Sequence, residues 1–95
     1  MSKAATYAIR VPYDNMEPRH HAGHWVLYET DEPPIVGQDV FIEMEDGTRI
    51  VWRLDAIHDG AINVAGYNPP VSKCIPLSHV AGLYPVLWSQ RNLPG

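Results

Sequence analysis

The sequence predicts a mainly β domain of short antiparallel strands and hairpins with little helix. Three observations lead to this fold class. Nine prolines and seven glycines are scattered over 95 residues, a composition that favours short strands and turns over long helices. Two Asp-Gly pairs each separate strand-like runs, which is the strongest short-range signal of a β-hairpin. No long segment repeats its apolar residues with the helical period.

The first strands are expected at residues 6–11 and 25–28. Between them, the segment 14–18 is expected to turn, because Pro18 drives the preceding residue away from helical angles. A meander of three strands follows, divided by Asp46-Gly47 and Asp59-Gly60, and its strands are expected at residues 40–45, 48–57 and 61–67. Asp-Gly suits a type I′ turn because both central residues of that turn need positive φ.

The last apolar run, residues 80–88, contains Pro85. A proline cannot donate to a strand ladder, so this run is expected to be an edge strand or a bulged one. Helical turns are expected only near residues 18–21 and 77–79. Residues 1–95 are expected to form one domain with a loose tail at about 89–95.

The two hairpins also predict a register. If both loops have two residues, Phe41 faces Trp52 and Trp52 faces Tyr67. The three rings would then form an aromatic row on one face of the sheet, with Trp52 in the middle. A one-residue bulge would break the row. Such a row is either ordinary sheet packing or an exposed patch that binds a partner or a second copy of the chain.

Composition limits the class of protein. Hydrophobic residues make up 45% of the chain and charged residues 19%, as in ordinary globular domains. The net charge is −4 with no basic stripe, so this surface is not expected to bind nucleic acid. The chain lacks the start of a signal peptide and an apolar run long enough to cross a membrane. Cys74 is the single cysteine, which excludes an internal disulfide. We expect a cytoplasmic protein without cofactor or membrane contact.

Motifs along the chain, taken in order, resemble a known family. Residues Asp14-Asn15-Met16-Glu17-Pro18, followed by Gly23-His24-Trp25-Val26-Leu27, resemble the G/D-S-M-x-P … G-D-x-V-L segment of the LexA-like peptidases. That family includes the C-terminal domains of LexA and lambda-type repressors, UmuD-like proteins and, more remotely, bacterial signal peptidases. Four later motifs also match it: Gly37-Gln38-Asp39-Val40, Asp46-Gly47 with Ile50-Val51-Trp52-Arg53-Leu54, Asn68-Pro69 and Val80-Ala81-Gly82. The resemblance implies a LexA/signal-peptidase-like domain of short, strongly bent strands.

The resemblance also implies where the family's chemistry would lie. In the family, a serine before Met-x-Pro is the nucleophile, and a lysine with a pKa lowered by burial takes its proton. Here Asn15 stands at the serine position and Trp52 at the lysine position. An amide is a very poor nucleophile and an indole is no base. We therefore expect a pseudo-peptidase without catalytic residues. Its former cleft, a candidate binding site, would comprise Asn15, Met16, Phe41, Trp52 and Tyr67.

Three histidines, His20, His21 and His24, lie close together in the sequence. Adjacent side chains point apart and no carboxylate or thiol completes a zinc spacing, so we expect a solvated loop and no metal. His24 occupies the family's aspartate position, where a turn hydrogen bond is an alternative. Turn or surface roles are expected for the carboxylates Asp14, Glu17 and Asp39.

Two further candidates lie on the later strands. Arg53 follows the lost lysine position, so it is expected to point to the opposite face and form a surface salt bridge or an interface contact. Ser72-Lys73-Cys74 contains a nucleophile and a base, but no third orienting group accompanies them. We assign neither segment a catalytic role.

The resemblance implies a function in self-association. In repressors of this type the domain dimerises so that two N-terminal helix-turn-helix domains grip an operator. This chain has no helix-turn-helix, so it is expected to be part of a longer regulator or a stand-alone relative. We predict a homodimer that does not cleave itself and that reaches DNA only through a separate domain.

Two other functions remain as alternatives. The first is a stand-alone module that binds a peptide or protein in the former cleft. The second is an enzyme with relocated chemistry, which predicts zinc bound by the histidines or activity that depends on Ser72 or Lys73.

Overall fold

The computed structural model describes residues 6–90, with side chains up to Leu87. Seven strands form one antiparallel sheet, and one 3-10 turn, η1 (Leu77–His79), precedes the last strand. The strands are β1 (Thr6–Arg10), β2 (Trp25–Glu29), β3 (Asp39–Met44), β4 (Arg49–His58), β5 (Ala61–Ala65), β6 (Ser72–Pro76) and β7 (Val80–Gln90). The expected mainly β fold with little helix is confirmed. No helix of the described residues is long and apolar enough to span a bilayer.

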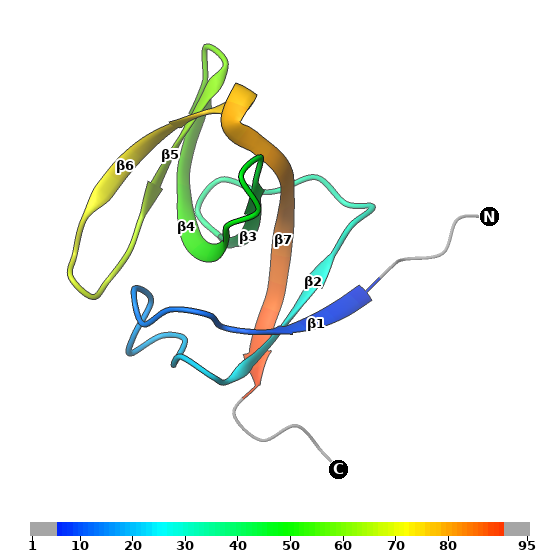
Figure 1. Cartoon of the computed structure of the whole chain (residues 1–95), viewed down its shortest axis with the longest axis vertical. Coiled ribbons are helices and arrows are strands. Elements are labelled where there is room, and N and C mark those ends of the chain that lie inside the picture. The colour runs from blue at the N-terminus through cyan, green and yellow to red at the C-terminus, as the bar shows by residue number, and fades with distance from the viewer. Residues whose placement is uncertain (1–5, 91–95) are drawn as a thin grey trace.

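The strand β7 connects the two parts of the sheet, whose order is β1-β2-β7-β3-β4-β5-β6. Its first half, up to Pro85, pairs with β3, and its second half, from Val86, pairs with β2. Figure 1 shows β4, β5 and β6 gathered on one side of β7, with β1 and β2 crossing its other end. Pro85 therefore stands where one ladder ends and the other begins, a place where its missing N–H is tolerated.

This position corrects one expectation for β7. The strand does not lie at the outer edge of the sheet, because β3 pairs with its first half and β2 with its second half. The bulge is confirmed: the β2–β7 pairing shifts between Leu27 and Tyr28, so that Leu87 is skipped. Residues 89 and 90, expected in a loose tail, belong to β7, which extends to Gln90. Residues 91–95 lie outside the described part of the chain.

The edge strand β6 lies in a segment for which the sequence predicts no strand. Ile75 is its only buried residue, so the segment lacks the apolar alternation that marks a strand. The turn expected near residue 18 is a turn, and the one near residue 77 is η1.

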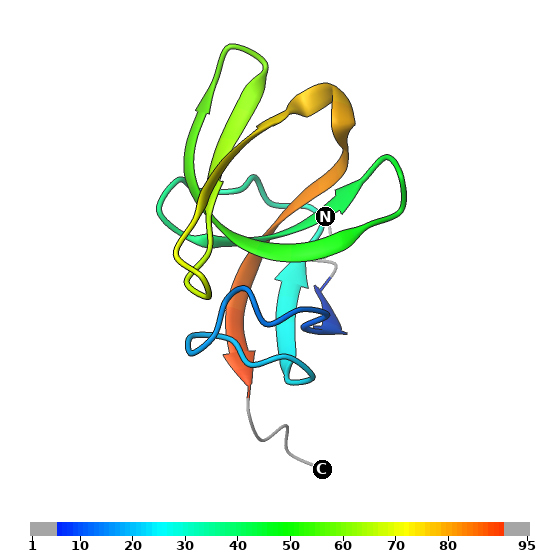
Figure 2. The same cartoon turned by 60° about the vertical axis from the view of Figure 1, so that its left-hand side comes forward.

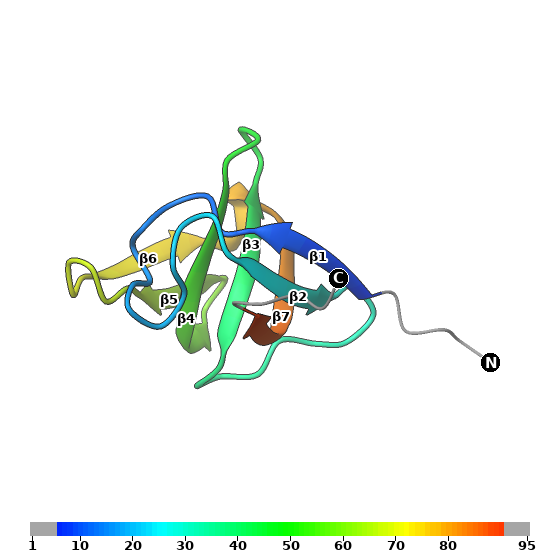
Figure 3. The ribbon, with the colours of Figure 1, turned by 90° about the horizontal axis from the view of Figure 1, so that it is seen from below.

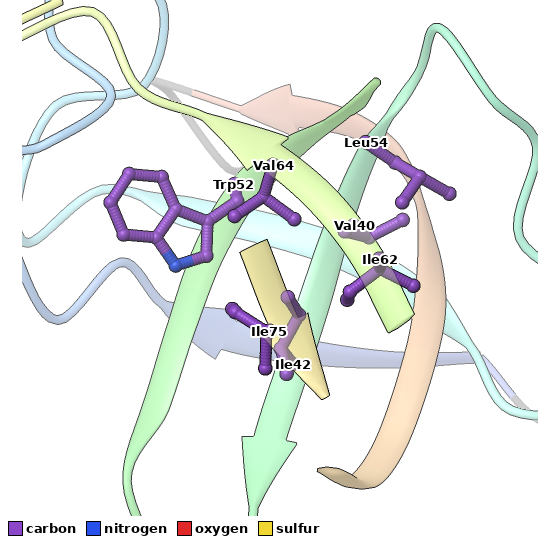
Figure 4. Close-up of a cluster of buried hydrophobic side chains, with 7 residues drawn as sticks. All are labelled: Val40, Ile42, Trp52, Leu54, Ile62, Val64 and Ile75. Atoms are coloured by element: carbon purple, nitrogen blue, oxygen red, sulfur yellow. The ribbon is translucent and has the colours of Figure 1, made fainter. Parts of the chain in front are cut away.

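The core consists of two apolar clusters on opposite faces of β3 and β4. The first cluster, drawn in Figure 4, contains Val40, Ile42, Trp52, Leu54, Ile62, Val64 and Ile75. The second contains Val11, Met16, Val26, Phe41, Val51 and Val86. Neighbouring residues of β3 and β4 alternate between the clusters because successive side chains of a strand point to opposite faces.

The predicted aromatic row of Phe41, Trp52 and Tyr67 is not formed. Phe41 pairs with Val51 and Trp52 with Val40, so Phe41 and Trp52 lie on opposite faces of the sheet. Tyr67 packs against the second cluster, with Phe41, whereas Trp52 belongs to the first.

The cause lies in one extra residue at each hairpin. In the first loop, the N–H of Met44 donates to the carbonyl of Thr48 at 2.8 Å and that of Gly47 donates to Met44 at 3.0 Å. Gly47 has φ of 92°, which completes a type I turn followed by a left-handed residue, a three-residue loop. The second turn forms as expected, with His58 facing Ala61, but the register then shifts between Leu54 and Ala56. A shift of one residue turns every later side chain to the other face.

Candidate functional site

Asn15 and Trp52, the two positions that the resemblance matched to the serine and lysine, both lie against Gly66. A Cβ atom on Gly66 would stand 2.7 Å from Cζ3 of Trp52 and 2.9 Å from the backbone oxygen of Asn15. Only glycine fits between them without a shift of ring or backbone. The fold therefore brings together two positions that are far apart in the sequence.

Asn15 is held by hydrogen bonds to two other segments. Its Nδ2 donates to the carbonyl of Val51 at 2.8 Å. Its own carbonyl accepts from the N–H groups of Tyr67 at 2.8 Å and Asn68 at 2.9 Å. These bonds hold the loop between β1 and β2 against β4 and the segment after β5. Figure 3 shows from below how this loop crosses β4. Within the described residues, Oδ1 of Asn15 is buried without a hydrogen-bond partner.

Trp52 is part of the core. Its side chain is 5% exposed, and the ammonium of Lys73 lies 5.6 Å from the ring centroid, a cation–π contact. Met16 and Phe41, two further residues of the former cleft, are fully buried. The rings and the amide at this place are neutral groups, so they supply neither a nucleophile nor a base.

Tyr67 lies next to Asn15, and strand β6 lies next to Trp52. Tyr67 is half-buried, with the guanidinium of Arg53 at 5.2 Å from its ring. Arg53 also forms the expected surface salt bridge, to Asp55 at 2.7 Å. Cys74 is exposed, while Lys73 lies over Trp52, so the Ser72-Lys73-Cys74 segment gains no orienting group from these contacts.

A second polar cluster, missed by the sequence analysis, lies at the start of β3. Asp39 is 5% exposed and accepts a hydrogen bond from Nε of Arg19 at 2.6 Å. Its Oδ2 also lies 2.5 Å from Nε2 of His20, which is 4% exposed. The solvated loop expected for His20 and the surface role expected for Asp39 are therefore wrong. The reason is that the loop after β1 folds back onto β3, a long-range contact that leaves no local sequence signal.

The other two histidines remain partly exposed. Their rings, His21 and His24, meet edge to face at 5.2 Å, and His21 lies 3.4 Å from Glu17. The one group of three potential ligand side chains in the described part of the chain is instead Glu29, Asp31 and Glu32, whose ligand atoms all lie within 4.8 Å.

The charge of Asp39 is set by its two partners. Burial by itself would raise the pKa of this carboxyl. The hydrogen bonds from His20 and Arg19 outweigh burial and hold the pKa below its ordinary value. The same bond to Asp39 raises the pKa of Arg19. Asp39 is thus an anion at neutral pH, and Arg19 forms a salt bridge with it.

A pocket of about 650 Å³ opens beside this cluster. Its wall combines charged side chains with exposed apolar ones. The lining residues are Arg19, His20, Glu29, Glu32, Pro33, Ile35, Gly37, Gln38, Asp39, Pro85, Val86 and Leu87. None of the five residues of the expected cleft belongs to this lining, so the pocket is separate from the place where Asn15 and Trp52 flank Gly66.

Comparisons with known proteins identify no relative. No family model, no curated protein and no solved structure matches this chain.

Proposed function

We propose that this chain is the non-cleaving self-association domain of a phage-repressor-like transcriptional regulator. The observation that carries the proposal is the meeting of Asn15 and Trp52 at Gly66. In the LexA-like family, the serine and the lysine at the matching positions must lie together to react. A resemblance due to chance would give no reason for these two positions to be neighbours.

The state of this place supports the loss of cleavage. The Asn15 amide already donates to the carbonyl of Val51, and Trp52 is almost fully buried. Peptide binding in the former cleft, the alternative function, gains no support, because Met16 and Phe41 have no exposed surface.

Self-association is supported by the free edge of β1. Among residues 6–90, this strand pairs with β2 alone, in a continuous ladder without a register shift. Edge strands that must stay single are usually blunted by a proline, a charged side chain or a bulge. Residues 6–10 contain no proline and no bulge, and their one charged side chain, Arg10, is the last residue of the strand and lies over the Trp25 ring. The edge is therefore open to pairing with a second copy of the same strand.

An aromatic stack ends at this edge. Tyr7 is 51% exposed and stacks on Tyr28 at 5.6 Å. Tyr28 in turn lies 4.6 Å from Phe41 and 5.5 Å from Tyr84, measured between ring centroids. Two β1 strands paired antiparallel about Ala8 would place Ile9 of the second copy opposite Tyr7, and aromatic–β-branched pairs of this kind stabilise sheets.

The experiment that tests the proposal changes Ala8, the centre of this pairing. Ala8→Lys and Ala8→Glu each place like charges directly opposite one another in a homodimer, which destabilises a strand pair. We expect each variant alone to sediment as a monomer where the unaltered chain dimerises. A mixture of the two variants is expected to restore a dimer, because the opposed charges then attract.

Ala81→Lys is the control, since it adds the same charge at an exposed position of β7. It is expected to leave dimerisation unchanged. A chain that stays monomeric at high micromolar concentration would refute self-association, and a mixture that fails to dimerise would refute the β1 interface.

A further inference from the structure

We propose that the pocket beside Asp39 binds an extended peptide with a basic side chain, which adds as a strand to the second half of β7. This site lies apart from β1 and does not depend on the proposed dimer. This peptide site differs from the former cleft, because none of the five cleft residues lines the pocket.

The second half of β7 has one unpaired edge. Pairing of β7 with β3 ends at Pro85, and from Val86 onward only β2 pairs with it. Figure 2 shows this second half of β7 extending past β3, beside β2. Among residues 6–90, no strand therefore occupies the edge opposite β2. A strand edge of this kind offers main-chain hydrogen bonds to an extended peptide.

The pocket lies where such a peptide would run. Its lining includes Val86 and Leu87 from β7, together with Asp39, the first residue of β3, and Gln38, which precedes it. An added strand would thus continue the line of β3, antiparallel to β7. The volume of about 650 Å³ lies within the range of known ligand pockets.

The charged side chains that line the pocket are mainly acidic. Glu29 and Glu32 line it, and their carboxylates, together with that of Asp31, have ligand atoms within 4.8 Å of one another. Among residues 6–87, no lysine, arginine or histidine forms a salt bridge with these three carboxylates. Arg19, the cation in the lining, is held by Asp39 at 2.6 Å. The pocket therefore has an excess of negative charge that a lysine or arginine side chain would neutralise.

Exposed apolar side chains lie next to these charges. Ile35 is 54% exposed and Leu87 45% exposed, and both line the pocket with Pro33. Large exposed apolar side chains around a pocket mark binding surfaces. Alternate residues of a strand share a face, so a peptide that alternates basic and apolar residues on one face would meet both surfaces.

The test uses a fluorescent peptide of about nine residues, the length of a long strand. The peptide contains two lysines, and threonine and valine occupy its other positions. A matched peptide has glutamates in place of the lysines. We expect anisotropy to report binding of the lysine peptide, with at least tenfold weaker binding of the glutamate peptide. Amide chemical shifts are expected to change around Val86 and Leu87. Methylation of alternate peptide nitrogens is expected to abolish binding, because the added strand then loses its donors.

Two double variants with the same net charge separate the pocket from general electrostatics. Glu29→Gln with Glu32→Gln is expected to weaken the lysine peptide roughly tenfold, as the loss of two partly exposed ion pairs predicts. Glu45→Gln with Asp59→Asn removes two exposed carboxylates at the hairpin tips. This control is expected to change the affinity less than twofold.

Several results would overturn the proposal. Equal effects of the two double variants would reduce the binding to long-range charge. Shift changes confined to β1 would place the peptide elsewhere. If Leu87→Asp abolishes dimerisation but leaves peptide affinity unchanged, the pocket is an interface between copies of the chain and not a peptide site.

Discussion

Gly66 lies between Asn15 and Trp52, and the close approach of both to this segment depends on it. Its missing side chain leaves room for the Trp52 ring on one side and for the Asn15 carbonyl on the other. The same segment, through the N–H groups that follow Gly66, binds the Asn15 carbonyl. A single glycine thus couples the loop after β1 to the core, which makes it a direct point of test.

Gly66→Ala is expected to lower the free energy of unfolding by about 1–3 kcal/mol, the usual effect of overpacking. The added Cβ would overlap Cζ3 of Trp52 and the Asn15 carbonyl. In a Trp52→Phe background the smaller ring relieves part of the overlap, so the loss caused by Gly66→Ala is expected to shrink. Urea unfolding of the four proteins measures this coupling. Additivity within about 0.5 kcal/mol would contradict the contact.

The buried Asp39 predicts a pH dependence of stability. Its pKa in the folded state lies below the ordinary value, so its contribution is complete above the unfolded pKa of about 3.9 and is lost as pH falls through the folded pKa. Asp39→Asn is expected to cost about 3 kcal/mol at neutral pH, because Arg19 and buried His20 lose their anionic partner. As the pH falls through the folded pKa of Asp39, the two proteins are expected to converge. Urea midpoints across this range measure the gap, and a constant gap would contradict the assignment.

At the scale of elements, strands bounded by turns were predictable and their registers were not. The runs that became β2, β3, β4 and β5 are rich in apolar, strand-forming residues and are bounded by turn residues, so their existence follows from local pattern. The Asp46-Gly47 pair predicted a hairpin correctly, but it fits a three-residue loop as well as a two-residue one. That single residue decided the faces of Phe41 and Trp52 and removed the aromatic row.

The position of β7 shows a second limit at this scale. A proline inside a strand predicts an edge, because the missing N–H would break a ladder. Here the strand changes partner from β3 to β2 at Pro85, so the residue is tolerated in the middle of the sheet. Only the pairing of strands that are distant in the sequence reveals this.

At the scale of the whole molecule, the two clusters meet through β3 and β4, which contribute alternate residues to both. The loop after β1 covers the second cluster, supplies Asn15 to the contact at Gly66 and supplies Arg19 and His20 to the pocket. The packing at Gly66 and the pocket beside Asp39 therefore depend on the same loop. A change in this loop is expected to affect both places.

The whole chain is expected to stay intact on incubation at about pH 10, where a lysine base would be deprotonated. Neither Asn15 nor Trp52 supplies a nucleophile or a base. Intact mass spectrometry of the incubated chain checks this expectation, with incubation at neutral pH as the control. Fragments that accumulate only at the alkaline pH would refute the loss of cleavage.

The sequence by itself determined the mainly β class, the strands with a clear apolar pattern and the turns with Asp-Gly. These properties depend on short stretches of chain, where residue type sets φ, ψ and burial preference. The tertiary structure alone decided the register of the hairpins, the partners of β7, the Asp39 cluster and its pocket. Each of these arises from contacts between distant segments, and one residue of loop length is enough to change them.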